Sequence, residues 1–237
     1  MKVLVLGGTG EARELAAVLH PAHQVITSLA GRVRDPKLPV GQVRVGGFGG
    51  PDALAEWLRD NGIDAVVDAT HPFAERISAS AARAAGVAGV PVVLLRRPGW
   101  TERPGDRWVR VPDLAAAAAG LPGDRVFLTT GRQGLAAFAG CPQRFLIRCV
   151  DPPEGPLPAD AEVVLARGPY TVDGEVDIMA RHRIDVLVTK DSGGPMTAAK
   201  LDAARVLGVA VLVVERPRPP DVPVVEDVAA ALAWLRT

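Results

Sequence analysis

The sequence has a single tyrosine, two cysteines and no excess of charge of either sign, and each scarcity excludes a class of protein. The 27 basic and 27 acidic side chains among 237 residues argue against a general nucleic-acid or membrane-surface binder, which needs a positive excess. Short-chain dehydrogenases place a lysine four residues after a tyrosine, whereas Tyr170 is followed at that distance by Gly174. That enzyme class is therefore excluded.

Metal centres, membrane spans and common hydrolase or nucleotide-hydrolase motifs are not found either. Cys141 and Cys149 form no Cys-x-x-Cys pair and lie near no histidine pair, so we expect no metal site and two reduced thiols in a cytoplasmic protein. No stretch reaches the about 18 apolar residues of a membrane span, and the apolar run in MKVLVLGG is too short for a signal peptide. No Gly-x-Ser-x-Gly elbow or Walker loop appears.

Short apolar runs alternate with segments of helical spacing. Runs that are apolar on both faces predict buried strands of a parallel sheet. In the first part of the chain the predicted strands are Val3–Leu6, Val25–Ser28, Val43–Val45, Ala65–Asp68 and Val92–Leu95. The predicted helices between them are Ala12–Leu19, Asp52–Asn61 and Phe73–Ala85.

The alternation pauses at a segment rich in proline, tryptophan and charge, Arg96–Asp113, and then resumes. The later predicted strands are Val126–Thr129, Phe145–Arg148, Val163–Ala166, Val186–Thr189 and Val211–Val214, with a last helix at Val228–Leu235. This pattern predicts an α/β protein of two Rossmann-like, doubly wound parallel-sheet lobes with a cleft between them. We expect a first lobe at residues 1–97, a crossover linker at 98–110 and a second lobe at 111–237.

A glycine-rich turn, GGTGEA, follows the first predicted strand. Residues without a Cβ let backbone N–H groups approach a pyrophosphate at the start of a helix. The turn has the first half of the dinucleotide fingerprint, but Arg13 stands where its last glycine should be. A tight strand-to-helix connection is the alternative. We predict that the turn binds a nucleotide cofactor through Gly8, Thr9, Gly10 and Glu11.

The end of the second predicted strand indicates which nucleotide. An NAD-specific site usually places an acid there, whereas this strand is followed by Ser28 and Arg32, with no acid before Asp35. A guanidinium offers paired donors to a 2′-phosphate. We therefore predict NADPH as cofactor, bound in the first lobe with Ser28 and Arg32, although Arg32 as a solvated loop charge is the alternative.

Two further loops are predicted to end at the same edge of the first sheet. VGGFGG contributes Gly47 and Phe48, and DATHPFA contributes Thr70, all three candidates for cofactor binding. His71 precedes a proline, which favours an extended backbone, so its ring could face a ligand. A hydrogen-bonded structural histidine is the competing interpretation.

The second lobe has cations at the ends of its predicted strands. In parallel sheets these ends meet at one edge, so the cations predict an anionic ligand there. Alternatively they cap helices or pair with Asp173, Asp177 and Asp191. The cations are Arg132, Arg148, Arg167, Lys190 and Arg216; our candidate substrate-binding residues are Arg132, Arg148, Lys190, Ser192, Gly193 and Arg216.

Several motifs, in order along nearly the whole chain, are similar to those of the precorrin-6A reductase family of cobalamin biosynthesis: LGGTGEAREL, SLAGR, VRVGGFGG, VDATHPFAERIS, TTGR and TKDSGG. The resemblance implies an oxidoreductase that transfers a hydride from a reduced nicotinamide to a carbon of precorrin-6A, giving precorrin-6B. The many carboxylates of that substrate would bind the second-lobe cations. His71 and Lys190 are then candidate catalytic residues, as proton donors or orienters, with water as the alternative donor.

Other readings of the sequence stay open. The family has a branch that reduces the cobalt-containing macrocycle, often with NADH, and Arg32 favours the NADPH-using branch. A non-catalytic NADP-binding sensor of an anionic effector and an oxidoreductase with another anionic substrate are further alternatives. We expect a tetrapyrrole as the small-molecule partner, no nucleic-acid or membrane partner, and a monomer or weak dimer.

Overall fold

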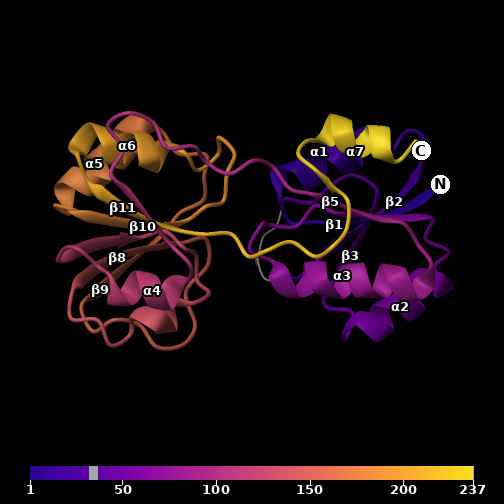
Figure 1. Ribbon diagram of the computed structural model, residues 1–237, viewed down its shortest axis with the longest axis horizontal. Coiled ribbons are helices and arrows are strands. Elements are labelled where there is room, and N and C mark those ends of the chain that lie inside the picture. The colour runs from indigo at the N-terminus through magenta and orange to yellow at the C-terminus, as the bar shows by residue number, and fades with distance from the viewer. Residues whose placement is uncertain (32–36, 237) are drawn as a thin grey trace. The chain divides into compact units, whose positions relative to one another are not determined.

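The computed structural model describes residues 1–31 and 37–236, which form two compact units (Figure 1). The first unit combines Met1–Pro98 with Pro217–Thr237, and the second is Gly99–Arg216. Each contains a six-stranded sheet in which every strand pairing is parallel. The predicted fold class of two parallel-sheet α/β lobes is confirmed.

The first unit has the sheet order β12-β5-β4-β1-β2-β3. Its central strand β1 is almost fully buried because helices cover both faces, which is why the sequence there is apolar at every position. The strands are β1 (Lys2–Leu6), β2 (Gln24–Leu29), β3 (Gln42–Val45), β4 (Ala65–Asp68), β5 (Val92–Leu95) and β12 (Val224–Val225).

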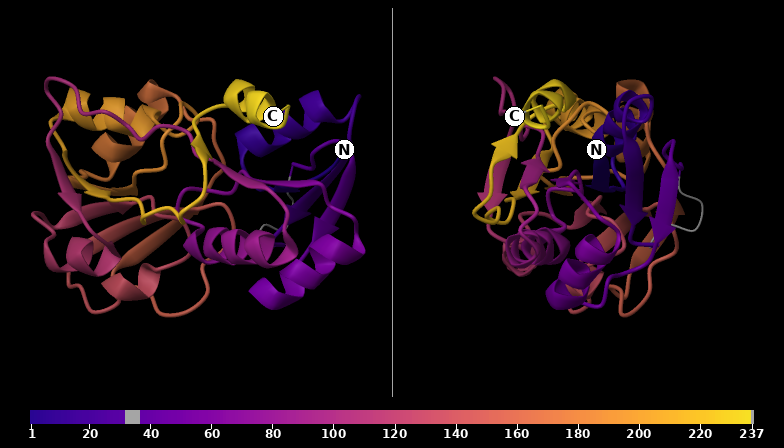
Figure 2. Two further views of the ribbon diagram at one scale, coloured as in Figure 1. Left: turned by 45° about the vertical axis from the view of Figure 1, so that its right-hand side comes forward. Right: turned by 90° about the vertical axis from the view of Figure 1, so that its right-hand side faces the viewer.

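Two helix pairs enclose this sheet. α1 (Gly10–Leu19) and α7 (Val228–Trp234) pack on one face, as the left view of Figure 2 shows, and their core includes Leu15 and Ala231. α2 (Pro51–Asp60) and α3 (Glu75–Ala88) pack on the other face around Leu54. No helix within residues 1–31 and 37–236 is long and apolar enough to cross a membrane.

The second unit has the sheet order β6-β11-β10-β7-β8-β9. α5 (Val172–Arg181) and α6 (Ala199–Leu207) pack on one face around Met179 and Leu187. The strands are β6 (Trp108–Val111), β7 (Arg125–Leu128), β8 (Arg144–Cys149), β9 (Ala161–Leu165), β10 (Val186–Lys190) and β11 (Ala210–Val214). The helices are α4 (Leu114–Ala119), the 3₁₀ helix η1 (Leu135–Phe138), α5 (Val172–Arg181) and α6 (Ala199–Leu207).

The chain route differs from the predicted boundaries at two strands. The expected second lobe included residues 111–237, but β12 pairs with β5 and α7 packs on α1, so the last segment belongs to the first unit. The expected linker at 98–110 contains most of β6, which pairs with β11. The sequence pattern did not reveal these strands. β12 has only two residues, and β6 is a partly exposed edge strand whose apolar run is interrupted by Arg110.

Both sheets reverse their strand order at the centre, between β1 and β4 in the first unit and between β7 and β10 in the second. Ligands of doubly wound sheets bind at the carboxyl ends of the strands beside such a reversal. In the first unit this point is bridged by Thr9, whose Oγ1 donates to the carbonyl of Ala69 at 2.7 Å. The same oxygen accepts from the N–H of Ala12 at 3.1 Å and so caps α1.

Replacing Thr9 by the isosteric valine should remove both bonds of this hydroxyl. We expect Thr9→Val to lower the free energy of unfolding by about 1–3 kcal/mol, because the cap is lost and the buried carbonyl of Ala69 is left without its donor. Urea unfolding followed by circular dichroism measures this. Ser80→Ala, which removes a hydroxyl bonded to Arg76 on exposed α3, is the control and should change little. Equal losses in the two variants would contradict the bridging role.

Candidate functional site

The glycine turn after β1 is open on the side that a phosphate would approach. Gly8 has a φ of +114°, and no heavy atom lies within 4 Å of the position that a Cβ would occupy. Gly7 is different, because a Cβ there would lie 2.7 Å from Cγ2 of Thr27. The first N–H groups of α1 lack partners within the helix and carry its positive dipole end. The turn can therefore accept a phosphate, with backbone N–H groups as donors.

The side chains of this turn serve the fold rather than a ligand. The hydroxyl of Thr9 is engaged by Ala69 and Ala12, so its backbone N–H remains the group that a phosphate could contact. Oε2 of Glu11 lies 2.9 Å from Nη1 of Arg97, which follows β5. This ion pair offsets the negative charge that Glu11 would otherwise present to an anion at the helix start.

Arg44, which the sequence analysis missed, organises the ends of β2 and β3. Its Nη1 donates to Oγ of buried Ser28 at 3.1 Å and to the carbonyl of Gly46 at 2.7 Å. Its Nη2 donates to the carbonyl of Gly47 at 2.8 Å, and its guanidinium lies 3.7 Å from the centre of the Phe48 ring. Burial lowers the pKa of Arg44. The signal that could have identified it is a cation directly before the glycine loop at a strand end.

Ser28, Gly47 and Phe48, three of the predicted cofactor-binding residues, are thus brought together around one guanidinium. Arg32, the residue on which the NADPH prediction was based, lies outside the described residues. Arg44 supplies a positive group beside Ser28 within the described part of the chain.

A cavity of about 180 Å³ lies at the carboxyl ends of β4 and β5 in the same unit. Asp68, buried at the end of β4, accepts at Oδ1 from the N–H of Thr70 at 3.1 Å and from its hydroxyl at 2.7 Å. Burial raises the pKa of Asp68, while its bonds to Ser78 and Thr70 act in the opposite direction. The hydroxyl of Thr70 donates to Asp68, which leaves its oxygen as an acceptor. The polar residues lining the cavity include Thr70, His71, Glu75, Ser78, Arg96 and Arg218.

His71 is exposed at the mouth of this cavity. Its Nδ1 accepts from the N–H of Phe73 at 3.3 Å, so Nδ1 carries no proton while this bond persists. In the neutral ring the proton then lies on Nε2, which is the atom that could donate to a ligand. Asp68 positions the neighbouring Thr70 but was not among the predicted site residues. The sequence feature that could have identified it is an acidic residue at the end of an otherwise apolar strand.

Arg148, predicted to bind substrate, lies instead in a buried ion pair of the second unit. Its Nη1 and Nη2 contact the two carboxylate oxygens of Glu175, the latter at 3.1 Å. The guanidinium carbon lies 3.8 Å from the centre of the Tyr170 ring and 4.8 Å from that of Phe127. These contacts favour a structural role, because leaving Glu175 buried without its partner would be costly.

The loop after β10 contains the other predicted residues of the second unit. Lys190 ends the strand, and burial lowers its pKa. Gly193 and Gly194 have φ values of +64° and +72°, a left-handed pair that fits glycine. Arg216 donates from Nε to the carbonyl of Asp191 at 2.7 Å, so it anchors this loop.

Arg132 follows β7 and lies near a carboxylate of an exposed residue. Its Nη1 is 3.4 Å from Oε1 of Glu154, which is 83% exposed, so an incoming anion could replace this weak pair. The adjacent Thr130 has a buried hydroxyl oxygen without a hydrogen-bond partner among the described residues. The second unit therefore groups Arg132, Lys190 and the Ser192–Gly194 segment at strand ends, whereas Arg148 and Arg216 hold the framework.

Lys200 is a buried cation that the sequence analysis missed. It lies on α6, where its Nζ donates to the carbonyl of Thr197 at 2.7 Å and lies 4.7 Å from the centre of the Trp100 ring. Burial lowers its pKa to about 7, with a smaller contribution from the charge of Arg148. The sequence feature that could have indicated a buried lysine is its position among small apolar residues of α6, such as Ala203 and Ala204.

Comparison with known proteins gives concordant matches over the whole chain. The family model described as Precorrin-6x reductase CbiJ/CobK matches residues 2–236. A precorrin-6A reductase of Rhodococcus erythropolis is 57% identical, with 100% of this chain and 98% of that protein covered. One of Mycobacterium tuberculosis is 51% identical, covering 99% and 97%. A cobalt-precorrin-6A reductase of Salmonella typhimurium is 30% identical, covering 92% and 88%.

A solved structure gives the same result for the fold. The structure described as CobK precorrin-6A reductase aligns with a TM-score of 0.92 at 44% identity, covering 100% of this chain and 96% of that chain. The two-unit architecture is therefore that of this solved relative.

The buried ammonium of Lys200 should make stability depend on pH. Its pKa falls from 10.5 to about 7 on folding, so between these values the folded protein binds fewer protons than the unfolded chain. Stability should then decrease as the pH falls from 10.5 to 7, with a slope of up to about 1.4 kcal/mol per pH unit from this group, and change no further below 7. Lys200→Met should remove this slope, measured by urea unfolding between pH 7 and 10. Lys37→Met, at an exposed position, should keep it. Parallel pH curves for Lys200→Met and wild type would refute the assignment.

Proposed function

This chain belongs to the precorrin-6x reductase CbiJ/CobK family, and on that premise we propose that it is an NADPH-dependent precorrin-6A reductase. The reaction adds a hydride and a proton to the macrocycle and gives precorrin-6B, the dihydro product. The observation that carries the cofactor assignment is the edge of the first unit, where an open glycine turn lies beside a serine and a guanidinium. The higher identity to precorrin-6A reductases than to a cobalt-precorrin-6A reductase supports the metal-free substrate.

NADPH fits the residues of this edge. Gly8 leaves a space that any Cβ would enter, which suits a pyrophosphate close to the backbone. Ser28 and Arg44 at the ends of β2 and β3 suit a 2′-phosphate, because a guanidinium binds phosphate oxygens through paired N–H groups. When bound, the nicotinamide supplies the hydride. The protein supplies binding, orientation and electrostatics.

We propose that the strand ends of the second unit bind the carboxylates of the substrate. Lys190 and Arg132 provide the positive groups, and the backbone N–H groups of Gly193 and Gly194 provide further donors. Arg148 stabilises the protein beneath these strand ends through its ion pair with Glu175 and its contact with the Tyr170 ring, and it does not contact the substrate.

The proton that accompanies the hydride has two candidate donors. His71 could donate from Nε2, since Nδ1 accepts from Phe73. Lys190 could donate from an ammonium whose pKa is lowered by burial, which eases loss of the proton. A proton from water is the third route.

The proposed activity is tested by anaerobic incubation of the protein with precorrin-6A and NADPH. We expect loss of nicotinamide absorbance in step with the change in the macrocycle spectrum, in a ratio of one to one. A non-catalytic sensor would bind NADPH without oxidising it. Parallel reactions with NADH and with cobalt-precorrin-6A distinguish the alternative branch of the family.

The coenzyme preference should depend on Arg44. Arg44→Ala should weaken NADPH binding by about 10- to 100-fold, the loss expected for a charged hydrogen bond, while NADH binding changes less than about threefold. Fluorescence titration with both coenzymes measures this. Arg83→Ala, which removes an exposed arginine paired with Asp52 in the same unit, is the matched control. Arg32→Ala tests the sequence-based assignment in the same assay. Equal weakening of NADPH and NADH by Arg44→Ala would show that Arg44 only positions the loop.

Substrate binding should depend on cations of the second unit. Lys190→Met and Arg132→Gln should each raise the KM for precorrin-6A by about tenfold or more and leave the KM for NADPH within about twofold. Arg107→Gln removes a charge at the opposite end of the strands in the same unit and serves as the control. A fall in kcat for Lys190→Met alone would add a proton-transfer role. Unchanged substrate KM in both variants would exclude the proposed carboxylate site.

A further inference from the structure

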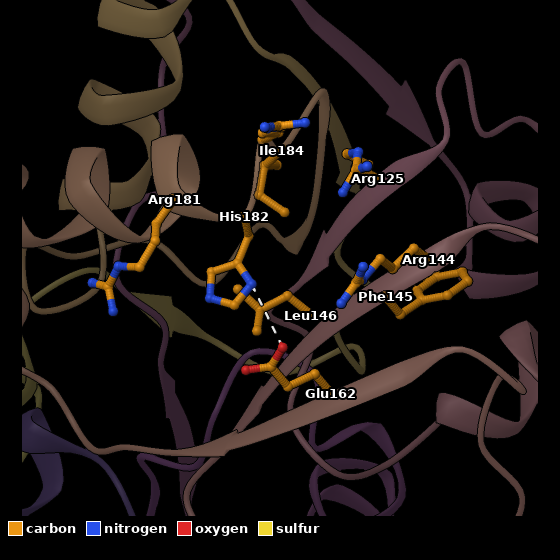
Figure 3. Close-up of a pocket in the computed structure, with 9 residues that line it drawn as sticks. Arg125, Arg144, Phe145, Leu146, Glu162, Arg181, His182 and Ile184 are labelled. Atoms are coloured by element: carbon orange, nitrogen blue, oxygen red, sulfur yellow. Dashed lines mark ion pairs between the residues drawn. The ribbon is translucent and has the colours of Figure 1, made fainter.

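The second unit has a strongly basic cavity at the edge of its sheet opposite the candidate substrate loops. The cavity has a volume of about 300 Å³ and lies at the amino ends of β7 and β8, whose first residues are Arg125 and Arg144 (Figure 3). Buried Leu146 and Ile184 form apolar parts of its lining. Its charged and titratable lining residues are Arg125, Arg144, Glu162, Arg181, His182 and Arg183.

Two of these cations are held side by side by the sheet itself. Arg125 and Arg144 are paired in register on neighbouring strands. Like charges directly opposite on adjacent strands are destabilising when nothing lies between them. In Figure 3 the guanidinium group of Arg144 points toward the space beside the His182 ring, whereas Arg181 extends away from it. An anion in this space would relieve the repulsion.

Carboxylates beside the cavity offset part of this charge without pairing with every guanidinium group. Oδ1 of Asp185 accepts from the backbone N–H of Arg125 at 3.0 Å and not from its guanidinium. Nδ1 of His182 lies 3.6 Å from Oε2 of Glu162, the one acidic residue that lines the cavity in the described part of the chain. Arg144 has a long, exposed contact of 3.9 Å with Asp160, and Arg181 pairs with Asp177 on its own helix.

Arg125 and Arg183 are the cations most available to a ligand. Neither has an ion pair or a side-chain hydrogen bond within residues 1–31 and 37–236. Arg183 also adopts a φ of +52°, the one non-glycine residue of the described chain in this region. This is the left-handed position that ends α5: the N–H of Arg183 donates to the carbonyl of Ala180 at 3.0 Å, and the N–H of Ile184 donates to that of Met179 at 2.9 Å. The turn fixes Arg183 beside the cavity.

We propose that this cavity is a second ligand site, for a small polyvalent oxyanion with closely spaced negative oxygens. Two guanidinium groups without partners can bind such an ion through paired N–H donors, and His182 offers a further ring nitrogen. The volume is at the lower end of small-molecule sites, so it suits a diphosphate or a tricarboxylate rather than a tetrapyrrole. The site uses none of the residues assigned to the reductase reaction and is independent of that proposal.

Titration of the full-length protein with inorganic pyrophosphate and, separately, with citrate tests the site. Isothermal calorimetry should show saturable binding of at least one of the two. The ring C–H signals of His182 should shift in parallel, and His182 is the one of four histidines that lines this cavity. His182→Gln assigns those signals. Binding of pyrophosphate alone indicates a phosphorylated ligand, and binding of citrate alone indicates a polycarboxylate.

Substitutions then locate the bound ion. Arg125→Gln and Arg183→Gln should each weaken binding by about tenfold or more, the loss expected for a charged hydrogen bond. Arg83→Gln, an exposed arginine of the first unit, should weaken it less than about twofold and controls for net charge. Pyrophosphate could also bind the glycine turn after β1. If Gly8→Val abolishes binding while Arg125→Gln and Arg183→Gln do not, the ion is at that turn and the proposal is wrong. Absence of saturable binding of either anion at millimolar concentration would overturn it as well.

Discussion

The parallel pairing of β1 with both β2 and β4 is the constraint on which the first unit depends. Because the three strands run in one direction and in close register, the segments that follow them emerge at the same edge of the sheet. β1 is enclosed by helices on both faces, so its position is fixed by the core and not by a ligand. The open turn at Gly8 is therefore a permanent feature of the fold, and the Thr9–Ala69 hydrogen bond joins it to the loop after β4.

Position and burial divide the cations of an electrically neutral chain into different roles. Arg44 serves two purposes, since it closes the glycine loop through backbone carbonyls and places positive charge beside Ser28. Arg148 is committed to Glu175 and two aromatic rings. Lys190 stands at a strand end with a lowered pKa. A charge at a strand end can therefore belong to the framework, as it does for Arg148.

Most of the fold could be predicted because a strand that is buried on both faces of the sheet is a short, continuous apolar run in the sequence. β4 and β5 match the predicted ranges Ala65–Asp68 and Val92–Leu95, since helices cover both sides of these strands. β6 and β12 could not be found in this way. An edge strand needs few apolar residues, and the choice of partner strand depends on residues far away in the chain.

Site residues could be predicted where the backbone requires one residue type, such as glycine. They could not be predicted where the role of a side chain depends on a contact with a residue distant in the sequence. The glycine pattern predicted a turn with room for close approach to the backbone, and Gly8 has a φ of +114° and open space where a Cβ would lie. The role of Arg148 depends on Glu175, which is 27 residues away and carries no local signal. Arg44 was overlooked because its function comes from contacts with a loop that bends back to it.

The path of the chain has a consequence for the order in which the protein can form during synthesis. The second unit is one continuous segment, Gly99–Arg216, whereas the first unit takes β12 and α7 from residues that are synthesised after that segment. Domains generally fold as units while the chain emerges from the ribosome. The second unit can therefore complete its sheet first, while the edge of β5 stays uncovered until β12 has been synthesised. The unit proposed to bind the coenzyme starts earlier in the sequence than the second unit but is completed after it.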